Sequence, residues 1–104
     1  MMIEAVVGGE KVWVAFEHKP TMAGVTVGGH LYVGVTACHL YTGGPKKEER
    51  REIGRGEAHC SEQDNFCKEK GRKGALRRAL EVAFPGGEGR EARAAVWKAY
   101  RGRG

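Results

Sequence analysis

Serine, glutamine, aspartate and asparagine are almost absent from this chain of 104 residues, which holds one of each. All four stand together in the segment SEQDN at 61–65. A single serine argues against serine-nucleophile chemistry, and a single aspartate excludes an aspartate dyad. The shortage of these types, with glutamate and arginine in their place, is typical of a thermophilic source or one rich in G and C.

Long apolar runs and paired cysteines are also lacking. No run reaches the roughly 20 apolar residues that a membrane span needs, and the N-terminus has no signal-peptide core. The cysteines Cys38, Cys60 and Cys67 are odd in number and fit no disulfide framework. We therefore expect reduced thiols, a cytoplasmic location and no membrane partner.

Metal and thiol chemistry are considered and set aside. His39 follows Cys38 and His59 precedes Cys60, but no CxxC pair or other usual zinc spacing accompanies them. A thiol nucleophile with His59 as base would need a third group to orient it, and the sequence offers none. A thiol at a helix start has a lowered pKa, so Cys60 is expected to be reactive without being catalytic. We expect no catalytic residue, no metal and no cofactor.

The charge of the chain is basic, with 18 Lys and Arg against 13 Asp and Glu and a net charge of +5. Such a balance favours anionic partners: nucleic acid, nucleotides or an acidic protein surface. Solubility alone is the alternative explanation for the charge.

The first half predicts an antiparallel meander of four or five strands. Strands are expected at 2–7, 11–17, 24–27, 31–37 and 52–59. Gly-Gly pairs at 8–9 and 28–29 supply the positive φ angles of hairpin turns. Pro20 is expected to break the second strand, and the charged segment 43–51 is expected to form a loop.

The hydrophobic period then changes from two to 3.6, which predicts two helices. Ser61 and Asp64 resemble a capping box at the start of a helix over 61–84, and Pro85-Gly86-Gly87 stops it. A second helix is expected over 88–101. The predicted fold class is α+β in a single domain, 1–104: an N-terminal antiparallel sheet (1–59) followed by two C-terminal helices on one face.

Each predicted helix carries an arginine on the face that should be buried. On a helical wheel Arg72 falls in the apolar arc of the first helix, and Arg93 lies one turn before Trp97 in the second. A buried guanidinium is costly unless it is paired. One interpretation is therefore an internal ion pair of either arginine with Glu69 or Asp64.

The other interpretation is that these helix ends line a pocket or an interface. Arginine binds phosphate bidentately and stacks on purine rings, so arginine beside an aromatic ring suits a nucleotide. The candidate ligand-binding residues are Phe66, Arg93, Arg72, Asn65 and Trp97.

The stretch GEAHCSEQDNFCKEKGRKGALRRAL, followed by REARAAVWKAY, is similar to a pattern of small phage-encoded proteins. One family of this build, which the second half of the chain resembles, is the phage anti-Thoeris sponge, an N-terminal antiparallel sheet followed by two helices. The resemblance implies a non-enzymatic protein of the host cytoplasm that sequesters cyclic ADP-ribose-type signals, as a dimer or hexamer, and in some members also cyclic oligonucleotides. It further implies that an aromatic ring and an arginine grip the adenine, roles that Phe66 and Arg93 would fill.

The expected function is therefore binding of a cyclic nucleotide immune signal, which blocks the host's anti-phage defence. The alternative is a basic nucleic-acid-binding protein, or a phage inhibitor that docks on a host nucleic-acid enzyme. That alternative rests on the loop at 46–51 and on Arg77 and Arg78. An enzyme is the third class.

A homo-oligomer is also expected. Trp13 and Tyr32 fall out of phase with the apolar faces of their strands, and Trp97 and Tyr100 are expected to extend past the core. Exposed aromatic side chains of this kind often anchor interfaces. The alternative is a monomer in which the loop at 38–51 covers these side chains.

Overall fold

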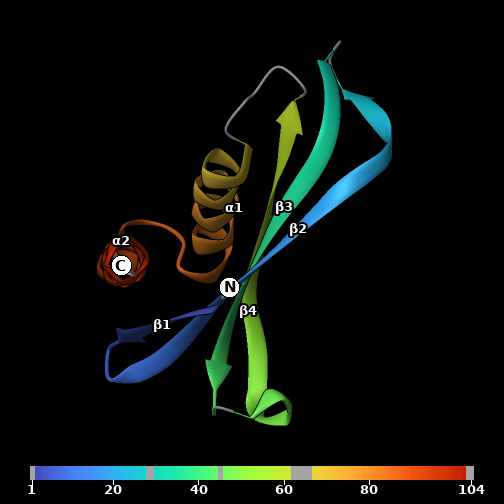
Figure 1. The fold of residues 1–104 in the computed structure, drawn as a ribbon. Helices are drawn as coiled ribbons and strands as arrows, with labels where there is room; N and C mark the ends of the chain where they lie inside the picture. Colours follow the sequence, from blue (N-terminus) through green and yellow to red (C-terminus); the bar gives the residue numbers. More distant parts are fainter. Residues whose placement is uncertain (1, 28–29, 45, 62–66, 103–104) are drawn as a thin grey trace.

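The computed structural model describes residues 2–27, 30–44, 46–61 and 67–102, and the side chains within 2–19, 34–44, 46–59 and 69–102. It shows a sheet followed by two helices, as the sequence predicts (Figure 1). The strands are β1 (Met2–Val7), β2 (Glu10–Val27), β3 (His30–Gly43) and β4 (Arg50–Ser61). The helices are α1 (Cys67–Ala83) and α2 (Arg90–Arg101), with one-turn 3₁₀ helices at Lys47–Glu49 and Gly87–Gly89.

The sheet is an antiparallel meander in which the strand order follows the chain, β1-β2-β3-β4. Gly8 and Gly9 connect β1 to β2 with φ angles of 58° and 83°, which only glycine adopts readily. The predicted hairpin turn at this position is confirmed. The turn predicted at 28–29 lies outside the described residues.

One face of the sheet is covered by both helices, and the other face carries no helix (Figure 1). The register places Val14 of β2 between Ile3 of β1 and Leu40 of β3, so their side chains share the covered face. All three are buried. The alternation of Val12, Val14 and Phe16 with polar neighbours therefore predicted the core face correctly.

β4 contributes almost no side chains to this core, because α1 lies directly on its glycines. A Cβ atom on Gly56 would lie 2.5 Å from the Ala79 nitrogen, and one on Gly54 would lie 2.6 Å from the Ala79 oxygen. Ala75, Leu76, Ala79 and Leu80 of α1 are fully buried above the sheet. Glycine in a strand often marks such a close approach of another backbone.

Two boundaries differ from the sequence predictions. β2 continues through Pro20 to Val27, with a register irregularity between Pro20 and Val25. Because the pairing of β1 ends at Ala15, Pro20 lies where β2 is an edge strand, and an edge tolerates a residue without an N–H.

The helix does not begin at Ser61, which pairs with Tyr32 as the last residue of β4. The expected capping partner Asp64 lies outside the described residues, and so do the side chains of Ser61 and Tyr32. The described part of α1 begins at Cys67. The strand pairing of β4 therefore continues into the segment that the capping pattern assigned to the helix.

The two edges of the sheet are treated differently. On β4, Arg78 of α1 donates a hydrogen bond to the backbone oxygen of Glu57, which covers an edge carbonyl. On the opposite side, β2 beyond Ala15 pairs only with β3 within the described residues. Exposed backbone groups on an edge are a template for pairing with another strand.

Candidate functional site

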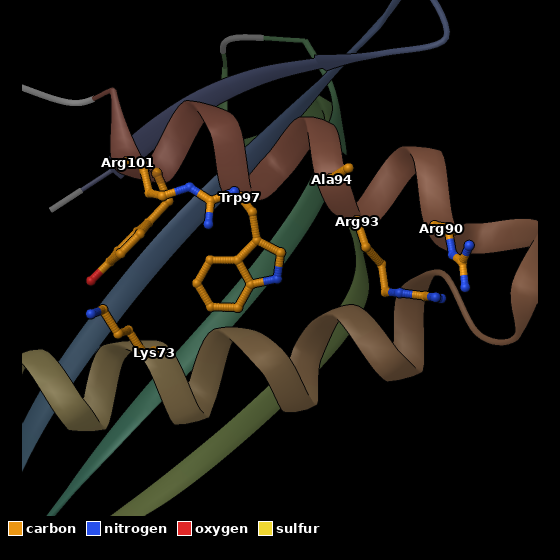
Figure 2. Close-up of a pocket in the computed structure, with 7 residues that line it drawn as sticks. Lys73, Arg90, Arg93, Ala94, Trp97 and Arg101 are labelled. Carbon is orange, nitrogen blue, oxygen red and sulfur yellow. The ribbon is translucent and has the colours of Figure 1, made fainter.

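A pocket of about 530 Å³ lies between α1 and α2. Its lining combines an indole ring with four cationic side chains (Figure 2). The lining residues are Lys73 of α1 and Arg90, Arg93, Ala94, Trp97, Tyr100 and Arg101 of α2. We call this pocket the interhelical groove. No acidic side chain, histidine or cysteine is among these lining residues, so the described groove is electropositive.

Arg93 holds the turn between the helices. Its Nη1 donates hydrogen bonds to the backbone oxygens of Phe84, 2.5 Å away, and Gly86, 2.7 Å away. Gly86 has a φ of 72°, and the predicted stop at 85–87 is confirmed. A guanidinium near carbonyls that no longer have helical partners stabilises the C-terminal end of α1. These hydrogen bonds explain why an arginine lies on the inner face of α2, and they hold the Arg93 side chain beside the groove.

Trp97 is held by aromatic packing. Its ring meets that of Tyr100 edge to face, with centroids 5.8 Å apart and an interplanar angle of 89°. Tyr100 in turn packs against Phe16 of β2, with ring centroids 5.8 Å apart, and is 1% exposed. It therefore belongs to the core, and the prediction that it extends past the core is wrong. Trp97 is only partly buried and packs against the core cluster. An aromatic ring anchored on one side and accessible on another is suited to stacking with a planar ligand.

Arg72 is not among the residues that line the groove, and Glu69 binds its guanidinium. Its Nη2 donates to Glu69 Oε2 at 2.7 Å, and Glu69 Oε1 accepts a hydrogen bond from the Tyr100 hydroxyl at 3.1 Å. The hydrogen bond with Glu69 raises the pKa of Arg72. The structure thus forms one of the internal ion pairs that the sequence left open, and this pair links α1 to α2.

The structure brings together two of the five predicted site residues, Arg93 and Trp97. Phe66 and Asn65 lie outside the described residues. Sequence reasoning missed Lys73, Arg90 and Arg101, although Arg90, Arg93, Trp97 and Arg101 recur every three or four residues along one face of the second helix. That spacing was available as a signal.

Thiol and metal chemistry find no support in the described residues. Cys38 is buried in the core, and burial raises the pKa of its thiol to about 12, which makes it a poor nucleophile. The side chains of Cys60 and Cys67 lie outside the described ones. Within the part of the chain whose side chains are described, no three His, Cys, Asp or Glu residues gather where they could hold a metal ion.

The uncovered face of the sheet carries aromatic and charged side chains that contact one another. Trp13 Nε1 donates to the Gly43 oxygen at 3.4 Å, and the Arg50 guanidinium lies 5.3 Å from the centroid of its ring. His39 stacks on Tyr41 and lies 2.6 Å from Glu52 Oε1. Trp13 is therefore partly covered by the segment 38–51, as the monomer alternative expects.

No protein-family model, curated protein or solved structure gives a significant match to this chain. In the described residues, neither helix has the length and apolar character needed to cross a membrane.

Proposed function

We propose that this chain is a non-enzymatic binding protein whose ligand is a nucleotide held in the interhelical groove. The observation that carries the proposal is the partly exposed indole of Trp97 in a groove lined by four cationic side chains (Figure 2). A nucleotide combines a planar base with negatively charged phosphate. Stacking on an aromatic ring and pairing with guanidinium groups are the two interactions that recognise this combination.

The build of the groove supports binding more than turnover. Arg93 and Trp97 are fixed by their hydrogen bonds and ring contacts, so their ordering does not have to be achieved when a ligand arrives. The described lining has no carboxylate, histidine or thiol to move a proton or attack a phosphate. These features suit retention of an intact ligand.

In its full form, the proposal is that the ligand is a cyclic nucleotide immune signal of the cyclic ADP-ribose type. The protein would sequester it in the cytoplasm of an infected host and so block anti-phage defence, with cyclic oligonucleotides as a related ligand class. The resemblance of the second half to the anti-Thoeris sponge motivates this form. Phe66 would add a second ring and Asn65 a further polar group.

The test is isothermal titration of the full chain with cyclic ADP-ribose isomers, followed by heat denaturation and recovery of the ligand. We expect saturable binding and chemically unchanged ligand after release. Trp97→Ala should weaken binding by about tenfold, because stacking on an aromatic ring contributes about 1–3 kcal/mol. Arg90→Ala tests a cationic contact in the groove and should weaken binding. Its matched control is Arg77→Ala, because Arg77 is exposed on α1 and does not line the groove. Absence of binding to every cyclic nucleotide, or release of a cleaved product, would refute the proposal.

A nucleic acid is the second candidate ligand, and the run of Arg90, Arg93, Trp97 and Arg101 along α2 is the observation that favours it. Exposed cations elsewhere, including Lys46, Lys47 and Arg77, would add contacts to a phosphate backbone. Salt separates the candidates, because the affinity for a backbone falls steeply with added salt in proportion to the phosphates contacted. A single small ligand should show a shallower slope.

We also propose that the chain forms a homo-oligomer, a dimer or a hexamer, through the uncovered face of the sheet. This face carries the partly buried rings of Trp13 and Tyr41, which the register places directly opposite each other, and the small side chains of Ala15 and Ala37 further along the same strands. Partly accessible aromatic side chains on a sheet face without a helix suit sheet-on-sheet packing across a two-fold axis. Light scattering that returned the 11.3 kDa of one chain at micromolar concentration would refute this part.

A further inference from the structure

The cations of the interhelical groove fall into two groups, one on each side of Trp97. Arg93, Trp97 and Arg101 follow one another at intervals of four residues, so they lie on one face of α2, each about 6 Å from the next along the axis. Figure 2 shows the indole of Trp97 between the guanidinium of Arg93 and that of Arg101. The ring is therefore flanked by positive charge.

The first group, Arg90 and Arg93, lies at the turn between the helices. Arg90 is the first residue of α2, and Arg93 is tied to this turn by its hydrogen bonds to Phe84 and Gly86. Arg90 is exposed, so its charge is available to a ligand in this end of the groove.

The second group, Lys73 and Arg101, lies at the other end. Lys73 Nζ is 3.9 Å from Glu69 Oε1, the atom that accepts the hydrogen bond from Tyr100, and Arg101 follows Tyr100 in the chain. Arg90 and Arg101 are about 16 Å apart along the helix axis, so their charges do not converge on one point.

We infer that the ligand of this groove is a nucleoside unit with phosphate on both sides of it, not a nucleotide whose phosphates form one chain at the 5′ position. This inference rests on the proposed function only in its general form, nucleotide binding in the groove. Of the two proposed ligand classes it selects the cyclic oligonucleotides over cyclic ADP-ribose, whose two phosphates form one bridge at the 5′ position. A base stacked on Trp97 would place one phosphate towards Arg90 and Arg93 and the other towards Lys73 and Arg101. The same chemistry occurs in a free 3′,5′-bisphosphate and in an internal unit of a longer chain.

The experiment compares two isomers of equal composition, adenosine 3′,5′-bisphosphate and adenosine 5′-diphosphate, with the guanosine pair in parallel. The full chain is titrated with each at one fixed ionic strength and without divalent metal. We expect the 3′,5′-bisphosphate to bind about fivefold or more tightly, because both groups of cations can pair with it.

Arg90→Ala and Arg101→Ala provide a matched pair, since both replace an exposed arginine of α2 at opposite ends of the groove. Each should weaken binding of the bisphosphate about threefold to fivefold, and only one of them should weaken binding of the diphosphate. Arg77→Ala, outside the groove, should change neither. Circular dichroism and the urea midpoint of each variant establish that all of them fold.

The outcomes separate the two proposals. Equal affinity for both isomers, with both end variants affecting both ligands alike, would overturn the inference and leave nucleotide binding intact. No binding of either isomer and of any cyclic nucleotide would overturn the proposed function and the inference with it. In the last arm, the full chain is titrated with a short single-stranded oligonucleotide. If the oligonucleotide binds more tightly than the bisphosphate and with a steeper salt dependence, the two-sided geometry is supported and the ligand is a nucleic-acid strand.

Discussion

The two helices are attached to the sheet in opposite ways. α1 lies on β4 with backbone against backbone, because Gly54 and Gly56 leave no side chains between them. α2 rests on β1 at one side and turns a face of long cationic side chains towards α1. Close contact leaves no room for a ligand, whereas long side chains around an aromatic ring leave a groove. The α1–β4 contact should therefore govern stability, and the α1–α2 groove should govern binding.

The largest expected effect is on the α1–β4 contact. Gly56→Ala would place a methyl group within 2.5 Å of the Ala79 nitrogen, so α1 must move away from the sheet. We expect a loss of about 3 kcal/mol in the free energy of unfolding, measured by urea denaturation.

Gly87→Ala is the matched control for this substitution, because nothing lies within 4 Å of the added methyl group and the φ of Gly87 is not positive. Its effect should stay within about 0.5 kcal/mol. Equal unfolding free energies for the two variants would show that α1 does not press on β4.

Next in size is the response of the sealed core to alkaline pH. The pKa of Cys38 is about 12 in the fold and 9.0 in its ordinary state, so the folded protein keeps a proton that the unfolded chain loses. The stabilising contribution is present below the ordinary pKa and is lost as pH rises towards the folded pKa, by about 1.4 kcal/mol per pH unit above roughly pH 9. Cys38→Ala, which removes this titration, should lose less stability than the wild type between about pH 8 and about pH 10. Parallel profiles of unfolding free energy against pH would contradict this assignment.

The attachment of α2 should respond more weakly. Tyr100→Phe keeps the ring in the core but removes the hydrogen bond to Glu69 at 3.1 Å. We expect a loss of about 1 kcal/mol in the free energy of unfolding. Tyr41→Phe, on the uncovered face, is the control and should change stability by less than about 0.5 kcal/mol. A larger effect at Tyr41 than at Tyr100 would reverse this ranking.

The smallest effects distinguish two neighbours on α1. Arg72→Gln removes the ion pair with Glu69, which is partly exposed, so stability should fall by about 0.5 kcal/mol while nucleotide affinity stays the same. Lys73→Gln should lose less stability than that, because its ion pair with Glu69 is longer and more exposed, and should bind nucleotide about threefold more weakly. The comparison fails if Arg72→Gln weakens binding as much as Lys73→Gln does.

Local patterns were sufficient to predict the fold class, the hairpin turn at Gly8 and Gly9 and the core side of both helices. Each of these depends on the period of a short segment, which is independent of what packs against it. The close contact at Gly54 and Gly56 could not be read in this way, because glycine in a strand has the same appearance whether it meets solvent or another backbone. The prediction that Pro20 ends the second strand was wrong for a related reason. A proline breaks a strand only where its missing N–H is needed by a neighbour, and β1 no longer pairs with β2 at Pro20.

The site was predicted in part. Arg93 and Trp97 share one face of one helix, so the wheel placed them together. Arg72 and Lys73 are adjacent in sequence, and which of them lines the groove is decided by the crossing of the two helices, which no single-helix pattern contains. Arg72 pairs with Glu69, which also accepts the hydrogen bond from the Tyr100 hydroxyl, so Arg72 belongs to the contact between the helices.

The bond from Arg78 to the carbonyl of Glu57 has a consequence for how copies of this chain can join. It closes the β4 edge at that carbonyl, while β2 beyond Ala15 has no strand on its outer side within the described residues. A sheet with two open edges can add copies without limit and grow into a fibre. Arg78 thereby protects one acceptor on the β4 edge, and strand pairing between copies is expected to use the outer side of β1 or of β2 beyond Ala15 instead.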